Sequence, residues 1–179
     1  AIMGAIGGLN QTSTRKIMAY SSMNHLSWMS ACAASFKKSW MLYLMMYLVL
    51  MISITWMMYS YNILYINQMN MFFSNNMNKL IIILMMMSLG GLPPFLGFLP
   101  KWITIQYMIN SKEIMMMIIM TMASLLTLNY YLRMSSSMIL MLSHSQKWMN
   151  MINTKKNMSL YMMIINLILP LMILLMNFY

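Results

Sequence analysis

Uncharged apolar runs, each about as long as a membrane-spanning helix, follow one another along most of this chain. A helix needs roughly 20 apolar residues to cross about 30 Å of bilayer hydrocarbon, where only helices and closed barrels satisfy every backbone group. Of the 179 residues, 61% are hydrophobic and 7% are charged, whereas roughly a quarter are charged in soluble domains. The sequence therefore predicts an all-α, polytopic membrane protein with a single transmembrane domain over residues 1–179.

One apolar run, residues 79–110, is too long for a single straight crossing. Its 32 residues would extend about 48 Å as a continuous helix, and paired glycines and prolines inside it are strong helix breakers. We therefore expect a discontinuous helix, broken at 90–94. The expected helix-breaking residues are Gly90, Gly91, Pro93 and Pro94. The other expected spans are 1–8 (the tail of a span), 17–36, 40–61, 114–132 (closed by Arg133) and 157–179, with a polar connection at 135–156.

Eleven basic residues and a single acid, Glu113, give the chain a formal net charge of +10. All but one of the basic residues lie between or beside the apolar runs, which is typical of topology signals and lipid contacts. We therefore expect a lipid bilayer as partner and no nucleic acid. Counting crossings places Lys37, Lys38 and Lys112 on one side of the membrane. The other side receives Arg15, Lys16, Lys79, Arg133, Lys147, Lys155 and Lys156.

The amino-acid usage points to the genome that encodes the chain. There are 32 methionines and one valine, Val49, with no aspartate and with abundant isoleucine, asparagine and tyrosine. AT-rich codons explain this pattern if ATA is read as methionine, as in the mitochondrial code of many animals. Methionine used as an adaptable core filler is the alternative, but it leaves the scarcity of valine unexplained. We expect a multi-pass protein of the mitochondrial inner membrane, with the side of seven positive charges facing the matrix.

Lys101 is the one basic residue inside an apolar run. A charge in hydrocarbon is expensive and marks ion or proton pathways, and lysine in a protein interior can load and release a proton. Counted back from Lys112, it lies about 16 Å into the membrane. The alternative is a lysine at a helix end whose side chain snorkels to the interface.

His25 and Lys16 are weaker candidates for proton transfer. His25 lies nine residues after Lys16, near mid-depth, where an imidazole can relay protons or simply form a packing hydrogen bond. Lys16 begins a span, either as an interfacial anchor or folded inward toward Lys101. No catalytic motif, dinucleotide fingerprint or phosphate loop is present. Two histidines and one cysteine, far apart in sequence, indicate no metal or haem site.

Two motifs carry a family resemblance, GGLNQTSTRKIMAYSSMNHLSWM at residues 7–29 and SLGGLPPFLGFLPKW at residues 88–102. They resemble the NADH–ubiquinone oxidoreductase chain 2 family, the mitochondrially encoded antiporter-like subunits of respiratory complex I. The resemblance implies an antiporter-like helix bundle, with Lys101 as the proton-carrying lysine of a broken helix. Lys16 and His25 fall at matching family positions. The family is about twice as long and the chain opens without methionine, so we expect a C-terminal half.

The resemblance implies a proton-translocating subunit that couples electron transfer from NADH to ubiquinone to proton pumping. It would belong to an enzyme, the H⁺-translocating NADH:ubiquinone reductase, without performing redox chemistry itself. NADH, flavin, iron–sulfur clusters and ubiquinone would bind elsewhere in the complex, and other complex I membrane subunits would be its partners. The alternatives are a purely structural membrane subunit and a stand-alone cation/proton antiporter.

Overall fold

The computed structural model describes residues 1–35, 39–69, 76–140 and 164, and in these it is helical, with one isolated bridge between Ser13 and Tyr65. Runs of Met and Leu, which have high helix propensity, fill most of the helices together with Ile. The elements are α1 (Ile2–Leu9), α2 (Thr14–Ser35), α3 (Ser39–Ser60), η1 (Ile66–Gln68), α5 (Asn76–Gly90), α6 (Phe98–Asn110) and α7 (Ile114–Leu140).

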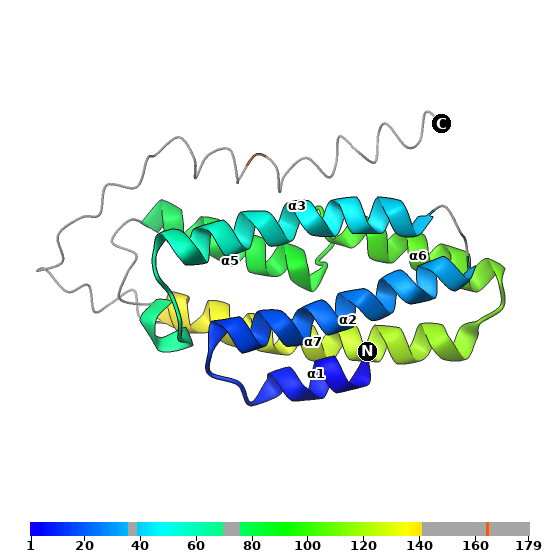
Figure 1. Ribbon diagram of the computed structural model, residues 1–179, viewed down its shortest axis with the longest axis horizontal. Helices are drawn as coiled ribbons and strands as arrows, with labels where there is room; N and C mark the ends of the chain where they lie inside the picture. Colours follow the sequence, from blue (N-terminus) through cyan, green and yellow to red (C-terminus); the bar gives the residue numbers. More distant parts are fainter. Residues whose placement is uncertain (36–38, 70–75, 141–163, 165–179) are drawn as a thin grey trace, which may run out of the picture.

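The long helices lie alongside one another in alternating directions (Figure 1). Helix α2 contacts α1, α3, α6 and α7, and is therefore central to the bundle. Helices α5 and α6 follow one another in the same direction, so that together they make one interrupted crossing. The structure thus confirms the expected helical bundle with a broken helix.

Two apolar clusters fill the bundle, one toward each end. The larger includes Ile54, Met85 and Tyr131, and the smaller includes Trp28 and Met108. A group of buried polar residues lies near mid-depth. It includes Ser21, Asn24, His25, Lys101, Thr104 and Thr127. Other buried polar residues, among them Thr14, Asn78 and Ser135, lie at the end of the bundle where α2 and α5 begin.

Helices α3 and α7 are long and apolar enough to cross a membrane. Helix α2 has the same length as α3, 22 residues, but carries Ser21, Asn24 and His25 on its buried side. Since polar side chains in membrane helices face neighbouring helices and not lipid, its low hydropathy follows from its central position.

The helix boundaries differ from expectation chiefly in α7. The sequence predicted an end at Arg133 and a polar connection from residue 135, but the helix continues to Leu140. The hydroxyls of Ser135, Ser136 and Ser137 donate to carbonyls three residues earlier in the same helix. These bonds satisfy the serines locally, so that this polar stretch stays helical. The expected span 157–179 lies outside the described residues, apart from residue 164.

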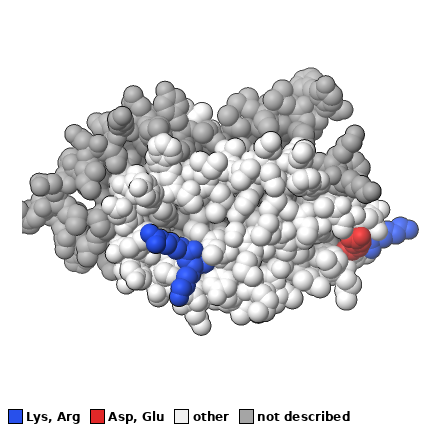
Figure 2. All heavy atoms as spheres, viewed as in Figure 1, with Lys and Arg blue, Asp and Glu red and all other residues white. Residues whose placement is uncertain are grey.

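Apart from Lys101, the basic residues in the described part of the chain lie at the ends of the bundle, and Figure 2 shows the single acid at one end. Arg15 lies in the first turn of α2 and Lys79 in that of α5, while Arg133 lies late in α7, which places all three at one end. Lys112 and Glu113 form the turn between α6 and α7 at the opposite end. The charges therefore divide between the two ends as the crossing count predicted. Lys37, Lys38, Lys147, Lys155 and Lys156 lie outside the described residues.

Candidate functional site

The site begins at the interruption between α5 and α6. Gly91 adopts a left-handed conformation, with φ of +82°, which suits glycine because it has no Cβ. Its N–H donates to Ser88 O at 3.0 Å, and the N–H of Leu92 donates to Met87 O at 3.3 Å. This is the Schellman pattern that ends a helix. The chain then turns through residues 91–97 before α6 begins, three residues further on than the break expected at 90–94.

Lys101 completes the end of α5. Its Nζ donates to Gly90 O at 2.8 Å and to Leu89 O at 3.4 Å, two of the terminal carbonyls that a helix end leaves without a helical partner. The negative end of the helix dipole also favours a cation at this position. The side chain is only 6% exposed. It therefore points into the protein, and the interfacial, snorkelling arrangement is not the one observed.

Two glycines leave the space that this arrangement needs. A Cβ added at Gly91 would lie 2.8 Å from Lys101 Cδ and from Nζ. A Cβ added at Gly97 would lie 1.8 Å from the backbone oxygen of Ser88. Gly91 therefore makes room for the lysine side chain, and Gly97 allows the turn to pack directly on α5.

His25 lies in the middle of α2, eleven residues after Thr14 and ten before Ser35. Each distance corresponds to about 15 Å of helix, so the imidazole is near mid-depth. His25 Nδ1 lies 3.0 Å from the hydroxyl of Tyr43, and its ring stacks on Tyr47 with centroids 4.7 Å apart. Both tyrosines come from α3. The ring is therefore held in one orientation by neighbours on another helix.

Lys101 and His25 lie at a similar depth on neighbouring helices. Lys101 lies nine residues before the end of α6 at Asn110, about 14 Å from that end, which matches the depth of His25. Helix α2, which carries His25, packs against α6, which carries Lys101. Next to His25 in sequence, Asn24 Nδ2 donates to Thr127 Oγ1 of α7 at 3.4 Å. Polar side chains of α2 thus contact α3 and α7, and α2 also packs against the helix that carries Lys101.

Lys16 does not join this group. It is exposed in the first turn of α2, nine residues before His25, and so lies about 14 Å away along the helix. Its role in proton transfer stays a prediction. Among the described residues, no three His, Cys, Asp or Glu side chains come together as a possible metal site.

Tyr43, Tyr47 and Gly97 belong to the site but were missed by the sequence analysis. Tyr43 follows His25 by 18 residues on another helix, and aromatic residues near helix ends are also typical of membrane interfaces. Gly97 lies beyond the expected break. Its position after the paired prolines was the only available signal. The tyrosines could be assigned to the site only from the packing of α2 against α3.

The chain is similar to several known proteins. The family model described as NADH:quinone oxidoreductase/Mrp antiporter, TM, matches residues 1–127. The NADH-ubiquinone oxidoreductase chain 2 of Anopheles gambiae is 42% identical over 168 residues, which cover 93% of this chain and 49% of that protein. The protein of the same name from Anopheles albimanus is 41% identical over 135 residues, covering 75% of this chain and 79% of that one.

A solved structure shares the fold. A chain of respiratory complex I from Thermus thermophilus, solved with bound aureothin, superimposes with a TM-score of 0.74 at 16% identity, covering 95% of this chain and 42% of that chain. The chain spans about half the length of the first curated relatives it matches. The family match covers more than half of the chain and includes both Lys101 and His25. The chain therefore belongs to the NADH:quinone oxidoreductase/Mrp antiporter transmembrane family.

Proposed function

We propose that this chain is a proton-translocating, antiporter-like subunit of mitochondrial respiratory complex I. The observation that carries the proposal is the position of Lys101. Its ammonium is buried near mid-depth on the carbonyls that end α5, and the buried His25 lies at a similar depth on the neighbouring helix α2. An ionisable group held inside a membrane bundle beside a broken helix is typical of proton and ion pathways.

Lys101 would hold the transferred proton. In the observed arrangement the carbonyl of Gly90 accepts a hydrogen bond from Nζ, and both this bond and the end of the α5 dipole stabilise the ammonium. A positive charge arriving at His25 would oppose that stabilisation, because two like charges repel strongly in a poorly solvated interior. A proton that enters at one group would therefore favour release from the other. Tyr43 would orient the imidazole for this exchange.

Electron transfer would take place outside this chain. We infer that NADH, flavin, iron–sulfur clusters and ubiquinone bind to other parts of complex I, and that neighbouring membrane subunits are the partners of this one. The chain would then contribute to NADH:ubiquinone reductase activity by coupling, without redox chemistry of its own. The relatives' name and the amino-acid usage, which is rich in methionine and poor in valine, support a place in the mitochondrial inner membrane.

An affinity tag on this chain tests the assignment to complex I. Mitochondrial membranes are solubilised in mild detergent, and the tagged chain is isolated and assayed for rotenone-sensitive NADH:ubiquinone reductase activity. We expect the activity to be recovered with the chain. The ratio of activity to the amount of chain should stay constant through a second purification step that separates by size. Isolation of the chain without NADH oxidation would support a stand-alone antiporter. Recovery of the activity with pumping that is indifferent to Lys101 would support a purely structural subunit.

A further inference from the structure

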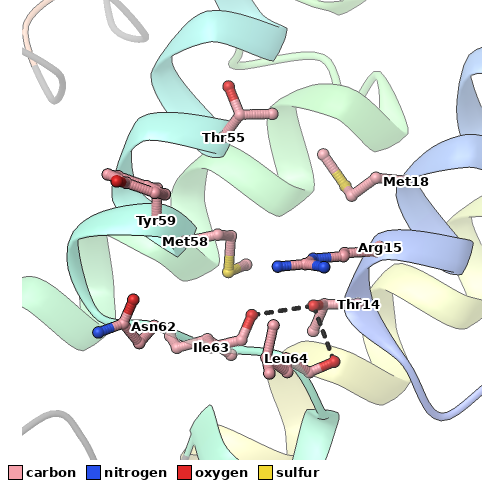
Figure 3. Close-up of a pocket in the computed structure, with 9 residues that line it drawn as sticks. All are labelled: Thr14, Arg15, Met18, Thr55, Met58, Tyr59, Asn62, Ile63 and Leu64. Atoms are coloured by element: carbon pink, nitrogen blue, oxygen red, sulfur yellow. Dashed lines mark hydrogen bonds between the residues drawn. The ribbon is translucent and has the colours of Figure 1, made fainter.

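A separate cavity of about 430 Å³ lies where α2 begins and α3 ends. Figure 3 shows Arg15 reaching from α2 into the space between the two helices, with Met18 above it and Met58 opposite. Tyr59 and Asn62 line the outer side. The cavity lies far along α2 from His25 and takes no part in the proposed proton path.

The floor of this cavity is held by hydrogen bonds. The hydroxyl of Thr14 donates to the carbonyls of Ile63 and Leu64, each at 3.1 Å, and the N–H of Thr14 donates to Leu64 O at 2.9 Å. Asn62, with φ of 52°, turns the chain sharply after α3. The cavity is therefore a built feature of the fold, formed where the end of α3 is fixed to the start of α2.

The charge in the cavity is positive and uncompensated by the described part of the chain. Arg15 is its charged lining residue, and the only acid of the chain, Glu113, lies at the opposite end of the bundle. A second cavity at the same end contains Arg133. That guanidinium donates to the carbonyls of Leu9 and Gln11, whereas Arg15 is exposed and its guanidinium points toward Met58 across the cavity (Figure 3).

The cavity also lies at the depth of lipid head groups. It adjoins the first turn of α2 and the last turns of α3, and the ends of spanning helices meet the membrane interface. Tyr59 is 83% exposed there, as expected for an aromatic side chain at that interface. Met18 and Met58 supply an apolar wall next to the guanidinium. A guanidinium pairs well with phosphate oxygens through two parallel hydrogen bonds.

We propose that this cavity binds the phosphate head group of an anionic membrane phospholipid. Arg15 donates to the phosphate oxygens, Asn62 lies within the same head-group region, and the first acyl carbons pack on Met18 and Met58. Basic pockets between membrane helices suit anionic head groups in this way. The site would fix a lipid against the joint between α2 and α3, the helices that carry His25 and Tyr43.

The test uses the assembled membrane complex that contains this chain, in native membranes supplied with phosphatidylglycerol that carries a photoactivatable group near the start of an acyl chain. After irradiation, labelled peptides are quantified by mass spectrometry. We expect labelling of Met18 and Met58, and we expect phosphatidylcholine with the same group to label them several-fold less. Arg15→Gln should reduce the phosphatidylglycerol signal roughly tenfold, because a charged hydrogen-bonding group is lost.

Two further variants control the result. Lys79→Gln removes a positive charge at the same end of the bundle from a residue outside the cavity, and should keep full labelling. Arg15→Lys keeps the charge but not the paired donors, and should give an intermediate signal even if Arg15→Gln fails to assemble. The proposal is overturned if the two lipids label the cavity equally. It is also overturned if Lys79→Gln and Arg15→Gln lose signal alike, or if another protein segment crosslinks there in place of lipid.

Discussion

Replacing Gly91 with alanine perturbs the site without removing any ionisable group. The new Cβ would have to keep a φ of +82°, which costs a residue with a side chain about 1–2 kcal/mol. It would also lie 2.8 Å from Lys101 Nζ, so that the ammonium must leave its position on Gly90 O. A hydrogen bond from a charged group contributes about 1.5–3 kcal/mol. Together the two effects disfavour the observed arrangement by about 2.5–5 kcal/mol, which is a change of roughly a hundredfold or more in its population.

The assay is NADH-driven proton uptake by sealed submitochondrial vesicles, normalised to the amount of assembled complex. Gly91→Ala should strongly reduce proton transport, because Lys101 can no longer rest on the end of α5. Gly90→Ala is the matched control, since the nearest neighbour of its Cβ would be Leu128 Cδ1 at 3.4 Å, an ordinary contact. Equal and normal transport in both variants would refute the argument that Gly91 exists to accommodate Lys101.

Three further changes follow from the contacts of the site and its scaffold. Tyr43→Phe removes the hydroxyl that lies 3.0 Å from His25 Nδ1 but keeps the ring. Proton transport should fall several-fold, while complex assembly, followed on native gels, stays normal. An unaltered transport rate would show that Tyr43 does not belong to the site. Gly97→Ala forces a Cβ to within 1.8 Å of Ser88 O, and because backbone must move, the yield of assembled complex should drop; wild-type yield would show that the turn packs differently. Arg133→Gln loses the guanidinium that binds the carbonyls at the end of α1 and in the connector to α2. This loss should destabilise the exposed connector by about 1 kcal/mol and lower the thermal-inactivation temperature of the complex. An unchanged inactivation temperature would mean that other contacts hold the connector.

The break between α5 and α6 could be predicted because its causes are local. Glycine and proline limit the backbone wherever they occur, so the paired residues located the interruption before any packing was known. The exact extent, residues 91–97, depends on the contact of Gly97 with Ser88. That contact joins segments on the two sides of the turn and leaves no local pattern in the sequence.

The predicted end of α7, at Arg133, differs from the observed end at Leu140 for a related reason. Three successive serines are typical of a connection, yet each satisfies its hydroxyl on its own helix, and the hydropathy of a single residue does not show where its hydrogen bonds go. Likewise, Lys101 was identified as the charge in an apolar run, but its partners are backbone carbonyls, which every residue has. The sequence could therefore predict which ionisable residues belong to the site, but only the packing of the helices shows their hydrogen-bond partners.

We propose that Lys101 carries a proton that is coupled to electron transfer. The decisive measurement is the number of protons moved per NADH oxidised in assembled complex, with wild type compared to Lys101→Met at equal complex content. Methionine has a similar length and no charge, so we expect NADH oxidation and proton transport both to fall while assembly stays intact. Unchanged values for both would show that Lys101 only supports the structure of the broken helix.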